Sequence, residues 1–206
     1  MSVLLAWGSS DYDQYPADSN RSEQRSPTLI DHFLLKNLPV LSIACGGRHT
    51  LLLTLHGQVF SFGHYSEGAI GREGNPCRPE QVQLPQPVDL ISTGENHSVC
   101  ATADGTVYTW GTFGRGGDSL PMQRYMYPHK LGQYENQTPR KLCSGNNHFL
   151  ILTRKSLYMC WGSDSRITSQ PRANNTSLMI ERVPLANVDD AFAGGDHCFA
   201  LICTKA

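Results

Sequence analysis

The 206-residue sequence contains few charged residues and no long apolar run. Charged residues make up 17% of it and the formal net charge is −1, so the chain lacks the positive charge by which proteins bind DNA through bulk electrostatics. No run approaches the roughly 18 apolar residues of a membrane-spanning helix, so no membrane contact is expected. The opening residues, MSVLLAWGSS, lack the basic region and the apolar length of a signal peptide. We therefore expect an intracellular protein.

Cysteine pairs and catalytic motifs are also lacking. The seven cysteines are an odd number and none forms a CxxC pair, so disulfides are not expected. GxSxG is absent and no Ser/His/Asp set stands out, which gives acyl transfer no support. The segment GRGGDS (114–119) lacks the Lys-Ser/Thr of a phosphate loop. We expect neither a cofactor nor bond-breaking chemistry.

What the sequence does contain is a sequence motif that recurs about every fifty residues. Its core is Gly-x-x-His, then an apolar strand, a tight turn, and a second strand that ends in aromatic-Gly. The copies are GGRHTLLLTLHGQVFSFG (46–63), GENHSVCATADGTVYTWG (94–111), the weaker GNNHFLILTRKSLYMCWG (145–162) and the opening half GGDHCFALI (194–202). The missing closing half stands at the other end of the chain as VLLAWG (3–8). A period in this range is typical of a propeller or a solenoid.

Residues 88–111 show how one copy builds a blade. Strands are predicted at 88–93, 98–102 and 107–110, and the Ala-Asp-Gly at 103–105 is a hairpin signal between the last two. An edge strand completes the unit, as EQVQLP (80–85) does in the preceding copy, and four hairpin-linked strands are blade architecture. The third copy has Arg-Lys-Ser at its turn, which should be the loosest of the three. We predict one all-β domain over residues 1–206, a β-propeller of four-stranded blades with repeat units at about 3–55, 56–103, 104–153 and 154–206.

The recurring glycines and histidines are interpreted as structural. Each glycine sits where the inner strand turns into its neighbour, where a Cβ would clash or force an unfavourable φ. One histidine per blade is what a structural role predicts, whereas a metal site needs three or four converging ligands. We expect each ring to hydrogen-bond backbone at the blade junction and predict no metal. The set is Gly46, His49, Gly94, His97, Gly145, His148, Gly194 and His197.

Acidic residues are the remaining candidates for function. Five of them fall in turns or loops expected at the rims of the blades: Glu95, Asp118, Asp189, Asp190 and Asp196. Carboxylates at a rim suit a basic protein partner or the coordination sphere of a bound cation. The alternative is ordinary solvated loop charge.

These residues resemble the regulator of chromosome condensation repeat, over nearly the whole chain. The sharpest match is GQVFSFGHYSEGAIGRE (57–73), and CSGNNHFLILT (143–153) and DDAFAGG (189–195) follow in the order of the first four repeats of the family's exchange factor for the GTPase Ran. The family fold is a seven-bladed propeller, of which this chain would hold the N-terminal part. The complementary half-units at its two ends also permit a short ring of four blades. The sequence leaves both open.

The resemblance implies a partner and a mechanism. The partner is a small GTPase of the Ran type, and the family's factor promotes GDP/GTP exchange by binding the nucleotide-free state, without covalent chemistry. Acidic residues in the corners take part in that grip. Glu95 keeps the family's charge, whereas Asn147 stands at an acidic position of the family. Asp196 is a further contact candidate, and the family's wedge-like hairpin corresponds to residues 112–121, with Gly116 and Asp118.

The resemblance also implies a nuclear location, with a cytoplasmic one as the alternative. The basic N-terminal tail that the founding member uses on chromatin is missing, which puts chromatin contact in doubt. The rival function is a non-catalytic repeat scaffold, or a truncated family member without exchange activity. An open array would expose a strand edge and an apolar blade face, and could self-associate through them.

Overall fold

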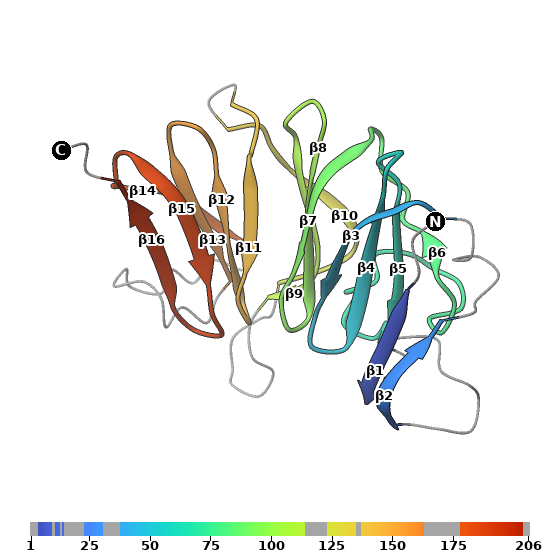
Figure 1. The fold of residues 1–206 in the computed structure, drawn as a ribbon. Helices are drawn as coiled ribbons and strands as arrows, with labels where there is room; N and C mark the ends of the chain where they lie inside the picture. The colour runs from blue at the N-terminus through green and yellow to red at the C-terminus, as the bar shows by residue number, and fades with distance from the viewer. Residues whose placement is uncertain are drawn as a thin grey trace.

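The chain is described by a computed structural model over residues 4–9, 11–12, 14, 23–30, 38–113, 123–134, 137–162 and 178–203. These residues form sixteen β-strands and no helix, which confirms the all-β prediction. The strands form narrow sheets that stand side by side (Figure 1). The described part of the chain has no helix of the length and hydrophobicity needed to cross a membrane.

Three of the sheets are complete blades of four antiparallel strands in chain order. The first blade consists of β3 (Val40–Cys45), β4 (His49–Thr54), β5 (Val59–Gly63) and β6 (Glu80–Gln81). The second consists of β7 (Val88–Thr93), β8 (His97–Thr102), β9 (Val107–Phe113) and β10 (Gln123–Gly132). The third consists of β11 (Lys141–Ser144), β12 (His148–Leu152), β13 (Leu157–Trp161) and β14 (Met179–Val183).

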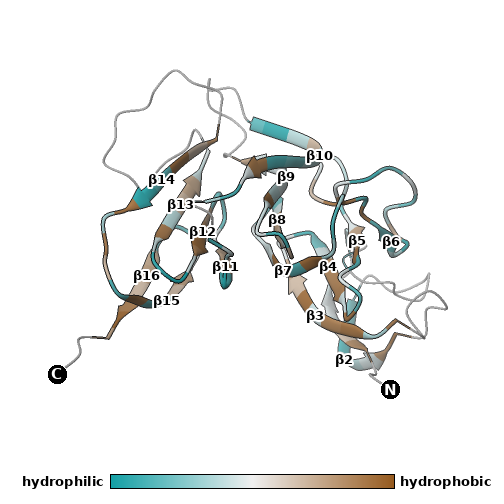
Figure 2. Cartoon of the chain, turned by 90° about the horizontal axis from the view of Figure 1, so that it is seen from above, coloured by the Kyte–Doolittle hydropathy of each residue, from teal (hydrophilic) through white to brown (hydrophobic). Residues whose placement is uncertain are grey.

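Two further sheets have only two strands each. They are β1 (Leu5–Ser9) with β2 (Glu23–Leu29), and β15 (Val188–Ala193) with β16 (Cys198–Ile202). Seen from above, β2 and β16 stand at opposite ends of an open arc (Figure 2). The two halves therefore do not pair within one chain, and the four-bladed ring is not formed. The architecture is the partial propeller.

The second blade follows the prediction for residues 88–111 closely. β7 has the predicted bounds, β8 begins one residue earlier and β9 ends three residues later. At the turn, the Asp104 carboxylate accepts hydrogen bonds from Thr102 Oγ1 (2.7 Å) and Thr106 N (3.0 Å). The short side chain of aspartate thus closes the hairpin that the Asp-Gly pair predicted. The edge strand of the first blade is shorter than expected, because β6 holds only two of the residues 80–85.

The hairpin of the third blade is tighter than the loose turn expected there. Thr153 N donates to Ser156 O (2.9 Å), and Ser156 N donates to Thr153 Oγ1 (3.0 Å). The hairpin of β12 and β13 is also one residue shorter than that of β8 and β9. The corner histidine His148 pairs with Trp161, whereas His97 pairs with Gly111.

The cores lie between blades, because alternate residues of a strand face opposite neighbours. In β8, Val99 and Ala101 pack toward the third blade, and Cys100 packs toward the first. The half-sheet β1–β2 covers the outer face of the first blade, with Ala6 packed on Phe62. Each blade therefore supplies one side of two cores, and Figure 2 shows the sheets standing next to one another along the arc.

At every corner the glycine leaves room for the histidine three residues later. A Cβ on Gly94 would lie 2.0 Å from Cε1 of His97 and 2.4 Å from the carbonyl oxygen of Gly145. The other three corners repeat the close approach, with distances to their own histidine ring of 2.1–2.3 Å. The predicted clash is confirmed, and its cause is the ring and the next blade's backbone.

The second reason expected for these glycines, an unfavourable φ, does not apply to them. Left-handed φ values occur instead where the closing strands end, at Gly8 (110°), Gly63 (116°) and Gly111 (95°). Such backbone angles strain any residue with a side chain. The two sets of glycine therefore serve different purposes, one steric and one conformational.

Gly94→Ala should destabilise the chain by about 1–3 kcal/mol, the usual cost of overpacking a tight site. Gly195→Ala is the matched control, because its Cβ would meet nothing closer than the Asn146 side chain at 3.1 Å. Urea unfolding followed by circular dichroism measures both free energies of unfolding. Equal stability of the two variants would contradict the steric account of the corner glycine.

Candidate functional site

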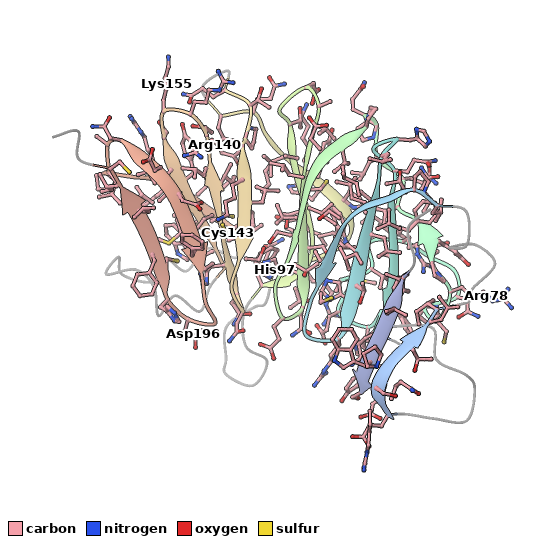
Figure 3. The ribbon with its side chains drawn as sticks, in the orientation of Figure 1. Arg78, His97, Arg140, Cys143, Lys155 and Asp196 are labelled. Carbon is pink, nitrogen blue, oxygen red and sulfur yellow. The ribbon has the colours of Figure 1, made fainter. Side chains whose placement is uncertain are left out.

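The four Gly-x-x-His corners line one rim of the arc. They join β3 to β4, β7 to β8, β11 to β12 and β15 to β16, and in Figure 1 all four turns lie along the lower side. Asp196, in the last corner, lies at this rim, whereas Lys155, in a hairpin turn, lies at the opposite one (Figure 3). A repeat with fixed corner geometry thus brings side chains about fifty residues apart onto one surface.

Backbone hydrogen bonds link successive corners. Gly47 N donates to Gly94 O (3.2 Å), Glu95 N donates to Asn146 O (3.2 Å), and Asn146 N donates to Gly195 O (2.8 Å). The corners border an open cavity of about 760 Å³ on the inner side of the arc. Its lining is the first two residues of each corner, Asn96, and the ends of the inner strands at Cys45, Thr93, Ser144 and Ala193. The rim is therefore a connected surface with an open centre.

The predicted contact residues differ in their exposure in the structure. Glu95 and Asp196 are both exposed on the rim. Within the described residues Glu95 has no side-chain hydrogen bond or ion pair, and its Cγ lies over Gly47, where a Cβ would stand 3.2 Å away. Asn147 is only 7% exposed, so it is not presented to a partner in this structure. Gly116 and Asp118 lie outside the described residues, as does most of the segment 112–121.

Two other acidic candidates do not lie in loops. Asp189 and Asp190 belong to β15. The Asp190 carboxylate accepts a hydrogen bond from Lys141 Nζ at 2.7 Å, and this bond is the first cause that holds its pKa below the usual value. The expectation of rim loops was wrong here because the strand begins earlier than the polar pair suggests. The charge of Asp190 thus joins β15 to the third blade.

The base of the segment 112–121 is held by contacts that the sequence did not reveal. Thr112 Oγ1 donates to Glu67 O (2.9 Å), and Arg124 reaches both Thr112 Oγ1 (3.2 Å) and the Glu67 carboxylate (3.1 Å). Glu67 lies in the stretch that follows β5, the part of the chain with the sharpest family resemblance. That resemblance was the available signal, but it did not say which residues touch.

The same stretch is organised by a buried arginine. Arg72 Nη2 donates to Ser61 O (2.7 Å) and Arg78 O (2.6 Å), and Nη1 pairs with the Glu80 carboxylate (3.2 Å). Its side chain is only 6% exposed. A guanidinium with several donors can fix an irregular loop in this way. The loop in turn carries the Ala69 carbonyl, which accepts hydrogen bonds from the next blade.

The corner histidines point into the junctions between blades. His49 Nε2 contacts Ser98 Oγ (2.9 Å), which donates to Ala69 O (2.8 Å). His148 Nε2 contacts Cys198 Sγ at 3.1 Å. The contacts of these two Nε2 atoms are therefore side chains of the following blade, and the expected backbone hydrogen bond enters as a smaller influence, from the backbone of His97, that raises the pKa of His49. The residue after the next corner histidine supplies the partner in both cases.

His97 is the exception among the three buried rings. The residue after the next corner histidine is Phe149, and His97 stacks on Phe113 with ring centroids 4.4 Å apart. Among the described residues neither of its ring nitrogens has a hydrogen-bond partner. Burial, together with the nearby rings of His49 and His148, lowers the pKa of His97 to about 3, and the backbone of Asn146 acts in the opposite direction. The ring is therefore neutral at physiological pH.

The contacts of the histidine and cysteine side chains are those of a structural role in packing rather than of metal binding or nucleophilic catalysis. No group of three or more His, Cys, Asp or Glu side chains in the described ranges is placed to hold a metal ion. Burial raises the pKa of Cys198 to about 11 despite the contact with His148. A protonated thiol is a weak nucleophile. The feature left for function is the exposed rim.

Residues 3–53 and 56–101 match the family model of the regulator of chromosome condensation (RCC1) repeat, and residues 40–68 and 88–116 match a second model of that repeat. Together these matches cover more than half of the chain. The chain belongs to the RCC1 repeat family.

Comparison with individual proteins agrees. The chain is 35% identical over 162 residues to the regulator of chromosome condensation of Homo sapiens, covering 73% of this chain and 36% of that protein. It is 32% identical over 174 residues to the E3 ubiquitin-protein ligase HERC2 of Mus musculus, covering 79% of this chain and 4% of that protein. Its fold is similar to that of Prp20p of Saccharomyces cerevisiae, with a TM-score of 0.84 and 24% identity, and the overlay covers 96% of this chain and 50% of that chain. The crystal structure of Prp20p is described together with its binding properties to Gsp1p and histones. The chain thus spans about a third of the human relative and half of the yeast one.

The buried histidines of this RCC1 repeat chain predict a loss of stability in acid. Their pKa is about 6.5 when unfolded, and burial lowers it to about 4 in folded His49 and about 3 in folded His97. The unfolded chain therefore binds more protons below pH 6.5, and stability falls as the pH drops from 6.5 toward 4. Each ring contributes up to about 1.4 kcal/mol per pH unit.

Urea unfolding at a series of pH values measures this slope. Between pH 6 and about 4.5, His97→Gln should reduce the slope of the free energy of unfolding against pH. The reduction corresponds to up to one proton taken up on unfolding. His56→Gln is the control, since His56 is exposed in a hairpin turn. An unchanged slope in His97→Gln would contradict the neutral, buried state of this ring.

Proposed function

We propose that this chain binds a small GTPase of the Ran type and promotes its GDP/GTP exchange by favouring the nucleotide-free state. The observation that carries the proposal is the connected corner rim, where the Glu95 carboxylate is exposed without an ionic partner in the described residues. Membership of the RCC1 repeat family supports the choice of partner. The binding of Gsp1p and histones named for Prp20p is a property of that protein and serves here as analogy.

The proposed mechanism needs no reacting side chain. A protein that binds the empty GTPase more tightly than the loaded one shifts the population toward the empty form, so nucleotide leaves faster. Exposed carboxylates at the rim would attract a basic surface and speed the encounter. Glu95 and Asp196 are the proposed contacts. Gly116 and Asp118, in the segment that corresponds to the family's wedge, remain sequence-based candidates.

The rival proposal is a repeat scaffold that binds a protein without exchanging nucleotide. One observation favours it: Asn147, at a family acidic position, is uncharged and buried. The similarity to a small part of HERC2 places such repeats in a protein described as a ubiquitin ligase. A scaffold would bind its partner independently of bound nucleotide. For location we propose the nucleus on family grounds, with the cytoplasm as the alternative.

Release of a fluorescent GDP analogue from Ran tests the exchange proposal. Micromolar wild-type chain should accelerate release, and Glu95→Gln should slow the accelerated rate by about tenfold, the equivalent of 1.4 kcal/mol. Asp89→Asn is the matched control, because Asp89 is exposed near the start of β7, the strand that ends next to the Glu95 corner. It should release nucleotide at the wild-type rate.

The result that would overturn the exchange proposal is release at the intrinsic rate with the wild-type chain present. A parallel binding measurement with nucleotide-free and GDP-loaded Ran then separates the two functions. Equal affinity for both forms would favour the scaffold, since a ligand with no preference shifts no equilibrium.

A further inference from the structure

The first corner of the rim differs in charge from the other three. Arg48 precedes the histidine at the corner that joins β3 to β4, whereas Asn96, Asn147 and Asp196 stand at this position in the later corners. Arg48 is exposed, and among the described residues no carboxylate pairs with its guanidinium. The rim that carries the Glu95 carboxylate therefore also carries a positive charge without an ionic partner in the described part of the chain.

A tyrosine ring holds this guanidinium in place. The Cζ atom of Arg48 lies 4.5 Å from the ring centroid of Tyr12, a residue of the connection between β1 and β2. A cation–π contact of this kind engages the face of the guanidinium. Its N–H donors lie in the plane, so stacking leaves them available to a ligand. Arg48 thus presents an oriented fork of donors at the rim.

Hydrogen bonds fix the segments that carry these two side chains. His64 N donates to Arg48 O (2.8 Å), which ties the corner to the stretch after β5. Thr50 Oγ1 donates to Gln14 O (2.6 Å), and Tyr12 N donates to Gln14 Oε1 (2.9 Å), so Tyr12 is tied to the start of β4. A surface fixed in this way loses little conformational freedom when a partner binds.

Further aromatic rings lie beside the stacked pair. The ring of Tyr12 contacts His64 edge-on with centroids 5.3 Å apart, and the rings of His64 and Tyr65 are 6.3 Å apart. Tyr12 is 38% exposed and Tyr65 is 59% exposed. Tyrosine and arginine are residue types that dominate the binding energy of protein interfaces. We call Tyr12, Arg48, His64 and Tyr65 the arginine patch, and its composition is that of an interface anchor.

The charge next to the arginine patch determines which class of ligand fits it. A fork of donors suits a carboxylate or a phosphate. Gly47, beside Arg48, lies against the next corner, where Cγ of Glu95 is 3.2 Å from the position of a Cβ on Gly47. A nucleic acid presents only negative charge along its backbone, so Glu95 would repel it. A protein surface can instead place a carboxylate against Arg48 and a cation against Glu95.

We propose that Arg48 binds a carboxylate of the same GTPase that Glu95 contacts, and that these two opposite charges fix the orientation in which the GTPase docks. The inference rests on the function proposed above. Turning the GTPase around on the rim would bring like charges together, which disfavours that arrangement. Tyr12 is a positioning residue because it acts through Arg48, and Tyr65 covers the surface beside the ion pair.

The affinity of the full chain for nucleotide-free Ran tests this contact. Arg48→Glu should raise the Kd by about tenfold, because it turns an attraction into a repulsion. Arg48→Lys should have a smaller effect, since it keeps the charge and loses the planar fork. Lys155→Glu is the matched control: it reverses the charge of an exposed residue at the opposite rim and should bind like the wild type (Figure 3).

A double-mutant cycle tests the positioning role of Tyr12. Tyr12→Ala should weaken binding by about threefold, and Tyr12→Phe should restore it because the ring face remains. In an Arg48→Gln background Tyr12→Ala should have no further effect, since the guanidinium on which it acts is gone. A Tyr12→Ala effect of full size in that background would contradict the positioning role. Circular dichroism should be unchanged in every variant.

The outcomes distinguish this inference from the proposed function. A wild-type chain that does not bind nucleotide-free Ran would overturn both. If the wild type binds and Glu95→Gln weakens binding, wild-type affinity in Arg48→Glu would overturn the Arg48 contact alone. An equal loss in Lys155→Glu would also overturn it, because the effect would then be one of overall charge. If Arg48→Glu alone weakens binding but the wild type does not accelerate GDP release, the docking contact stands and the exchange proposal falls.

Discussion

The packing of a histidine ring into the space that a corner glycine leaves determines how neighbouring blades meet. A Cβ at Gly46, Gly94 or Gly145 would collide with the ring of its own corner and with the glycine carbonyl of the next corner. Removing that one carbon lets two inner strands approach and places the ring between them. The spacing of the blades, the backbone links between corners and the position of the rim all follow from this contact.

The partner of the ring varies, which shows that shape matters more than any one hydrogen bond. The following blade offers a hydroxyl at Ser98, a phenyl ring at Phe149 and a thiol at Cys198. Only the first and last contact Nε2, yet all three junctions have the same corner geometry. An unpartnered ring such as His97 is tolerated because a neutral imidazole stacks well on an aromatic face. The cost is that protonation is disfavoured there.

Local pattern predicts what lies within one repeat. The strands of residues 88–113, the Asp104 turn and the steric glycines follow from residue type and spacing. What lies between repeats could not be predicted in the same way. The burial of Asn147, the link from Glu67 to Arg124 and the loop around Arg72 depend on how two blades meet, and no periodicity records that. The segment with Gly116 and Asp118 lies outside the described residues, so that part of the candidate site stays a prediction.

The offset between repeat and blade explains why the ends of the arc matter. A sequence unit such as 56–103 begins on the outer half of one sheet and ends on the inner half of the next. Any whole number of such units therefore leaves an outer half at one end and an inner half at the other. Local pattern cannot say whether these halves meet, because that depends on curvature summed over all blades. In this structure β1–β2 and β15–β16 stand at opposite ends of the arc as separate two-stranded sheets.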